Sequence, residues 1–230
     1  VLSTDHDRKK AQYVSRIRGS KPMPDYWSLM VGDVIHNLRS ALDNLTYALA
    51  VKAFGGVPSL DEIKKIQFPV CDGPGEFHGP NGQKTRRLSL LSDKATAAIE
   101  RLQPYTTPTR PKPHPLAVLR ELANIDKHRH ILFTAAVLRP ILVRVNTPSG
   151  GQSVFPGSFE GPFEDGTVCC VFPDTGLGPA SEMDVDSDIP VDIAFGDLPP
   201  VHGTSVRPEL VRIRDHIRDI VLPVLEPLLI

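Results

Sequence analysis

Residues 32–45 read GDVIHNLRSALDNL and form the centre of the longest helical pattern in the chain. Between residues 25 and 54 the apolar side chains recur at three- and four-residue spacings: Val31, Val34, Ile35, Leu38, Leu42, Leu45 and Leu49. This spacing gives a helix one continuous apolar face. Pro22 and Pro24 precede the pattern, and Gly55 and Gly56 follow it. The sequence therefore predicts a helix over residues 25–54.

Further helices and a set of strands are predicted outward from this centre. Helical signals cover residues 59–66, 92–102, 116–127 and 207–229. Strand signals, which are short runs of Val, Ile and Phe bounded by Gly, Pro or Asp, cover residues 131–137, 141–146, 167–172 and 191–195. The predicted fold class is α+β, a helical bundle with a small antiparallel β-sheet inserted before the C-terminal helix.

The length of 230 residues and the 40% hydrophobic content predict a single domain over residues 1–230. We expect residues 1–24 to form a basic N-terminal arm, with a short helix over 5–18. Residues 25–130 form the helical part, residues 131–196 the β-rich insert, and residues 207–230 the helix that returns to the bundle.

The charge balance restricts the partners that the chain can hold. With 26 Lys and Arg against 27 Asp and Glu, the whole molecule exerts no general attraction on polyanions. An RNA partner would need local basic clusters, and the N-terminal arm and Lys84, Arg86 and Arg87 are the candidates. No apolar stretch is long enough to span a membrane, so we expect a cytoplasmic protein without membrane contact.

The three cysteines, Cys71, Cys169 and Cys170, have no C-x-x-C spacing, so we expect buried side chains and no zinc site. No P-loop, dinucleotide fingerprint or nucleophile elbow is present, and no cofactor is expected. Helices that flank a hairpin commonly self-associate, which makes a homo-oligomer an expectation.

Two groups of polar residues do not fit a simple amphipathic helix. On the 25–54 helix, His36, Arg39 and Asp43 share one flank, and Arg39 and Asp43 are spaced to form an ion pair. Asn37 and Asn44 share the other flank with Asp33, beside the small residues Ala41 and Ala48, a pattern typical of a close helix contact. The first flank is either a solvated face or part of a site.

The second group is NIDKHRH, residues 124–130. If the 116–127 helix continues, Asp126 and His130 lie in line with its apolar stripe, where polar groups are costly unless paired. The residues along the edge of this stripe are Arg120, Asn124 and Lys127. Three interpretations stay open: the helix stops near Asp126 and the groups are solvated, they form a buried network, or they line a pocket.

Together, residues 32–45 and LRELANIDKHR at 119–129 resemble a group of bacterial and phage proteins without an established activity. These proteins carry a GDxxHNLRSALD helix and an NxDKHR helix. A more distant resemblance is to HEPN domains, the helical domains of RNA-cleaving toxins and defence proteins, which carry an R-x(4–6)-H arrangement. Here Arg120 and His128 are separated by seven residues, a departure from that pattern.

The first functional hypothesis is a HEPN-like, metal-independent endoribonuclease. In it, His128 or His130 transfers protons and Arg39, Arg120 or Lys127 balances the charge of the phosphate. The alternative is a non-enzymatic binding or assembly module in which both motifs form a structural brace, with Arg39 and Asp126 as the preferred pair.

A metal-dependent hydrolase is the second alternative. The residue types that could ligate zinc or manganese are present at His36, Asp43, Asp126, His128 and His130. No spacing among them fixes a coordination geometry, so no metal site is assigned.

Overall fold

The computed structural model gives a mixed α+β protein. It describes residues 2–18, 24, 26–107, 113–128, 131, 133–137, 141–146, 151–157, 165–174, 184–188, 191–196, 198–199 and 201–230. The contacts gather in two compact units. A β unit comprises Val1–Asp25, Leu132–Asp197 and His202–Val206, and a helical unit comprises Tyr26–Ile131, Leu198–Val201 and Arg207–Ile230. The expected single domain over residues 1–230 stays a prediction.

The helical unit contains the long helices that the periodicity predicted. They are α1 (Tyr26–Phe54), α5 (Asp93–Arg101), α6 (Pro115–His128) and α7 (Val206–His216). Short helices link them: α2 (Leu60–Ile63), α3 (Pro74–His78), α4 (Gln83–Arg87) and η1 (Pro104–Thr106). The segment between residues 69 and 83 is only partly irregular, because Pro74 begins α3.

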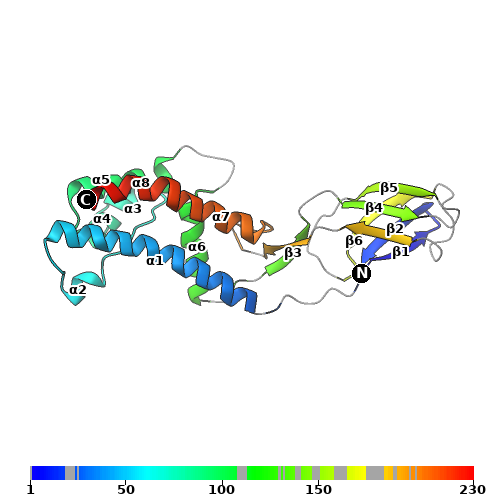
Figure 1. Cartoon of the computed structure of the whole chain (residues 1–230), viewed down its shortest axis with the longest axis horizontal. Coiled ribbons are helices and arrows are strands. Elements are labelled where there is room, and N and C mark those ends of the chain that lie inside the picture. The colour runs from blue at the N-terminus through cyan, green and yellow to red at the C-terminus, as the bar shows by residue number, and fades with distance from the viewer. Residues whose placement is uncertain are drawn as a thin grey trace. The chain divides into compact units, whose positions relative to one another are not determined.

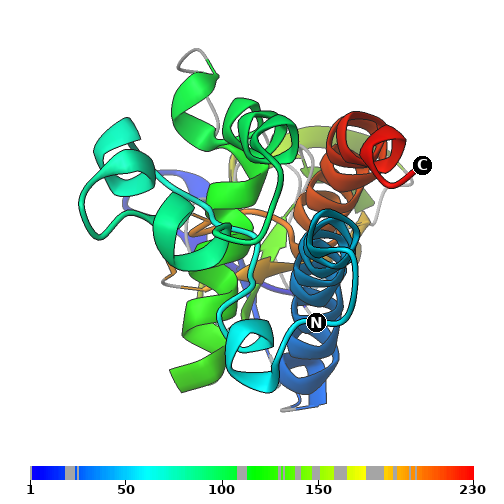
Figure 2. The ribbon, with the colours of Figure 1, turned by 90° about the vertical axis from the view of Figure 1, so that its left-hand side faces the viewer.

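The apolar face of α1 packs into the core of the helical unit. Val31, Ile35, Leu42 and Leu49 are buried, as their spacing predicted. Val34 departs from the prediction, because its side chain is 42% exposed. In Figure 2, which looks along α1, helix α6 and the C-terminal helix lie to either side of the core-facing half of α1.

Helices α1 and α6 approach each other closely at Gly32. A Cβ atom built on Gly32 would lie 2.5 Å from Oδ1 of Asp126, a separation that side-chain atoms do not adopt. Gly32 therefore permits this approach because it has no side chain.

The C-terminal helix runs from α7 through a π-helical turn, η3 (Ile217–Val221), into α8 (Leu222–Leu225) and η4 (Glu226–Leu228). Pro223, which cannot donate a backbone hydrogen bond, lies in α8 directly after the π turn. Ile213, Ile217, Val221 and Leu225 of this helix are buried.

The β unit corrects the prediction for residues 1–24. The arm is a β-hairpin and not a helix over 5–18, with β1 (Leu2–Asp7) antiparallel to β2 (Gln12–Ile17). The Asp7 carboxylate accepts hydrogen bonds from the amides of Lys9 and Lys10 in the turn, and Ala11 ends the turn with φ +47°. These contacts favour a turn where helical propensity alone favours a helix.

Within the described ranges, the strands form three antiparallel sheets. The remaining strands are β3 (Phe133–Val137), β4 (Ile141–Asn146), β5 (Gln152–Gly157), β6 (Val168–Pro173), β7 (Asp184–Asp188) and β8 (Val191–Phe195). Their orders are β1-β2-β6, β5-β4-β7 and β3-β8. The four predicted strands are present, but β5 and β7 were not predicted, and the N-terminal hairpin joins β6. The protein is therefore not a clear bundle with one inserted sheet.

Aromatic stacking joins the two three-stranded sheets. The Phe172 ring of β6 stacks on Tyr13 of β2 at a centroid distance of 5.4 Å and on Phe155 of β5 at 4.7 Å. Figure 1 shows β4 and β5 as a layer over β1 and β2. Cys169 and Cys170 are buried in β6, as predicted. Within the described part of the chain, no helix has the length and apolar content needed to cross a membrane.

Candidate functional site

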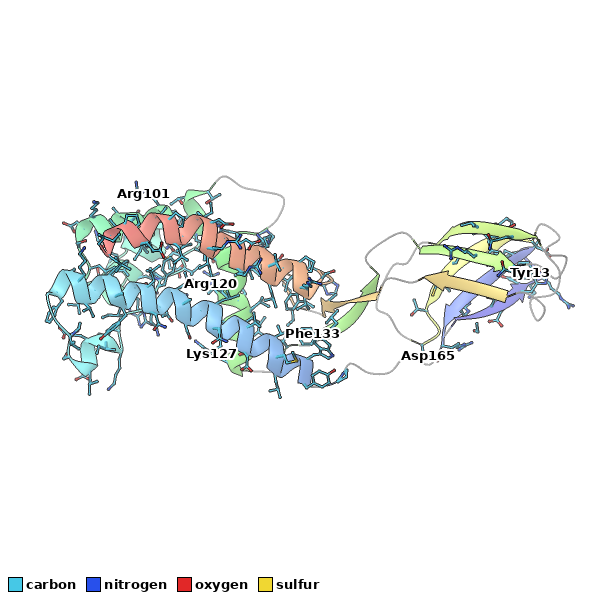
Figure 3. All side chains as sticks on the ribbon, viewed as in Figure 1. Tyr13, Arg101, Arg120, Lys127, Phe133 and Asp165 are labelled. Atoms are coloured by element: carbon cyan, nitrogen blue, oxygen red, sulfur yellow. The ribbon has the colours of Figure 1, made fainter. Side chains whose placement is uncertain are left out.

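A polar cavity of about 320 Å³ in the helical unit brings the two sequence motifs together. Arg39 and Asp43 line it from α1, and Arg120, Asn124 and Lys127 line it from α6. Figure 3 labels Arg120 and Lys127 on α6, where this helix passes α1. Three interpretations of the second motif were open. The positions of Arg120, Asn124 and Lys127 agree with the one in which the polar residues line a pocket.

One wall of the cavity is the buried segment of residues 68–70, which lies outside helices and strands. Its backbone groups need other partners because no neighbouring strand satisfies them. Side chains from helices supply these partners. The Phe68 amide donates to Oδ1 of Asp43 at 2.8 Å, and Arg39 donates to the Phe68 carbonyl at 2.5 Å. The first motif is thus a clamp on this segment.

Arg39 and Asp43 form the ion pair that their spacing predicted, with a separation of 3.0 Å. Their side chains are 20% and 28% exposed. Burial lowers the pKa of Arg39 despite the opposing effect of Asp43. Burial also raises the pKa of Asp43, while Arg39 and the Phe68 amide act in the opposite direction. The Arg39 and Asp43 side chains therefore form a largely buried ion pair in the wall of the cavity.

Arg120 holds the same segment from α6. Its Nη1 donates to the Val70 carbonyl at 3.2 Å, and its Nη2 donates to Asp72 at 2.7 Å and to Glu121 at 3.3 Å. Burial acts to lower the pKa of Arg120, but the hydrogen bond and charge of Asp72 raise it. Nη1 and Nη2 of Arg120 are thus hydrogen-bonded to protein groups.

Gln103 binds the same irregular segment as Arg39 and Arg120. The sequence analysis does not predict this role, because Gln103 only follows the end of a predicted helix and precedes Pro104. Its side chain is fully buried. Nε2 donates to the carbonyls of Pro69 and Ile99, and Oε1 accepts from the Cys71 amide at 2.9 Å. No local pattern marks such a residue, since its partners Cys71 and Pro69 lie more than thirty positions away along the chain.

Two other cations line the cavity without a carboxylate partner of their own. Arg87 of α4 is half-buried and Lys127 of α6 is exposed. Among the described residues, neither forms an ion pair within 4.0 Å. Both charges act on Asp43 and lower its pKa, against the effect of burial. The lining holds four cations in all, with Asp43 and Glu76 as the carboxylates.

The expected pair of Arg39 and Asp126 is wrong. Arg39 turns to Asp43 and Phe68, while Asp126 is half-buried and lies against Gly32. The described residues contain no ion pair within 4.0 Å between the two motifs. Their connection runs through residues 68–72, because both arginines bind backbone carbonyls of that segment.

The remaining predicted site residues lie outside the cavity lining or outside the described residues. His36, Asn37 and Asn44 are exposed on α1, and His36 lies 3.4 Å from the Ser40 hydroxyl. The backbone of His128 ends α6, but its side chain is not among those described, and His130 lies outside the described residues. Within the described ranges, no three His, Cys, Asp or Glu side chains gather as a metal site would require.

Comparisons with protein-family models, with curated proteins and with solved structures find no match to this chain.

Proposed function

We propose that the chain is a non-enzymatic RNA-binding module, in which the two polar motifs brace the cavity and Arg87 and Lys127 contact the ligand. The observation that carries this proposal is a difference among the four cations that line the cavity: two of them pair with carboxylates of the protein and two do not. Arg39 and Arg120 each bind a carbonyl and a carboxylate of the protein. Among the described residues, Arg87 and Lys127 line the cavity without a carboxylate partner, and Arg87 donates only one long hydrogen bond, 3.5 Å, to the Lys65 carbonyl.

This division argues against a catalytic role for Arg39 and Arg120. A cation that stabilises a reacting phosphate needs donors directed at the substrate. Nη2 of Arg39 donates to Phe68 and Asp43, and Nη1 and Nη2 of Arg120 donate to Val70 and Asp72 instead. The endoribonuclease hypothesis therefore has less support than the binding hypothesis.

Additional basic residues beside the cavity favour a polyanion. Helix α4 contributes Arg87 to the lining and also carries Lys84 and Arg86, both exposed. Arg87 also lies within reach of the Lys65 carbonyl, and the Lys65 side chain is exposed. These cations can contact successive phosphates of a strand whose first phosphate enters the cavity.

The test is binding of a short single-stranded RNA to the full chain by calorimetric titration over a range of salt concentrations. We expect Arg87→Gln and Lys127→Gln each to weaken binding about tenfold, the loss of one charge-assisted contact. Each should also reduce the salt slope by about 0.7. The matched control is Lys94→Gln, an exposed cation on α5 that does not line this cavity.

Two results would overturn the proposal. Absence of binding by the wild-type chain at low salt would remove RNA as the ligand. Cleavage of the RNA in EDTA, abolished by His128→Ala or His130→Ala without loss of thermal stability, would replace the binding module with the HEPN-like endoribonuclease.

A further inference from the structure

The positive charge of the cavity is concentrated in two residues. The charge of Arg39 is offset by Asp43, and that of Arg120 by Asp72 and Glu121. The other lining carboxylate, Glu76, accepts a hydrogen bond from the Asp72 amide. Among the described residues, Arg87 and Lys127 are left as the lining cations without a carboxylate partner, although Nη1 of Arg87 donates to the Lys65 carbonyl at 3.5 Å.

The walls enclose the cavity from several directions. Helix α1, helix α6, residues 67–70 and helix α4 each contribute lining side chains. Its volume of about 320 Å³ is near the lower limit of small-molecule sites, roughly 300 Å³.

We propose that the cavity binds a phosphate monoester at the end of an RNA strand, an inference that rests on the proposed RNA binding. A terminal phosphate carries about 1.5 to 2 negative charges at neutral pH and three acceptor oxygens. An internal phosphodiester carries one charge. Arg87 and Lys127 match the higher charge, and the amides of Gln83 and Asn124, which also line the cavity, can donate to the oxygens.

The experiment compares three RNA oligonucleotides of identical sequence, with a 5′-phosphate, with a 3′-phosphate, or with hydroxyls at both ends. Binding to the full chain is measured by calorimetric titration without labels. We expect at least one phosphorylated strand to bind about tenfold more tightly than the dihydroxyl strand. The 5′ and 3′ strands identify which end supplies the group.

Arg87→Gln and Lys127→Gln should each remove most of this preference, whereas Lys94→Gln should retain it. Equal affinity for all three strands would overturn the inference and leave the proposed RNA binding intact. A preference that survives both cavity substitutions would also overturn it, because the terminal phosphate would then bind elsewhere. Failure of all three strands to bind the wild-type chain would instead refute the proposed function.

Discussion

At the scale of single residues, Gln103 holds the segment that forms a wall of the cavity through its hydrogen bonds to Pro69 and Cys71. Gln103→Ala leaves the Cys71 amide and the Pro69 carbonyl buried without their partner. Each unsatisfied group costs about 1–3 kcal/mol, so we expect a loss of about 2–6 kcal/mol in unfolding free energy. Urea denaturation measures it. Gln67→Ala, at a half-buried lining position, should cost less than about 1 kcal/mol. Equal losses for the two variants would contradict the role given to Gln103.

The Cys71 thiol makes the unfolding free energy decrease as the pH rises through the alkaline range. Burial, and then the charge of Glu76, raises its pKa from 9.0 to about 12. The folded chain thus keeps a proton that the unfolded chain releases, so this contribution is complete below pH 9 and is lost as the pH rises towards 12.

We therefore expect the urea midpoint of the wild-type chain to fall between pH 8 and pH 11 more steeply than that of Cys71→Ala. The slope is the readout, since the smaller side chain also lowers the stability at every pH. Tyr105, whose pKa burial raises from 10.0 to about 12, adds a loss of the same sign from pH 10 upward. Parallel curves for the wild type and Cys71→Ala would show that folding does not raise the pKa of the thiol.

At the scale of elements, the turn between β1 and β2 contains a strained position. Ala11 has φ +47°, a conformation that glycine adopts without steric cost. Ala11→Gly should raise the unfolding free energy of the β unit by about 0.5–1 kcal/mol, measured by calorimetry. Arg8→Gly in the same turn should lower it, because no positive φ is relieved there. A decrease for Ala11→Gly would mean that the turn has another conformation.

At the scale of the whole molecule, the helical unit depends on the C-terminal end of the chain. Ile213, Ile217, Val221 and Leu225 are at most 6% exposed. Burying four such side chains contributes roughly 6–12 kcal/mol, comparable to the net stability of a domain, about 5–15 kcal/mol. A chain that ends at residue 205 should therefore lose cooperative unfolding of the helical unit, as followed by far-ultraviolet circular dichroism.

A point substitution tests the same dependence without truncation. Ile213→Ala should lower the unfolding free energy by about 2–5 kcal/mol. Ile220→Ala, on the same helix but 49% exposed, should cost less than about 1 kcal/mol. Similar effects at both positions would show that this helix does not pack into the core.

The sequence patterns do not predict how the chain divides into the β unit and the helical unit. Each unit is assembled from three separate stretches, and β2 pairs with β6 across more than 150 residues. Strand pairing over such distances leaves no periodic signal in either partner. Without the pairing to β6, the local pattern of the N-terminal residues predicts a helical arm instead of a hairpin.

The sequence by itself determined the α+β class, the long helices and four of the strands, because apolar spacing reflects which face of an element is buried. It also determined the Arg39 and Asp43 pair, since both residues lie on one helix. Only the tertiary structure decided that Arg39 binds Phe68, that Arg120 binds Val70, and that Arg87 and Lys127 line the same cavity. The physical reason is that a buried irregular segment takes its hydrogen-bond partners from whichever side chains the fold places beside it.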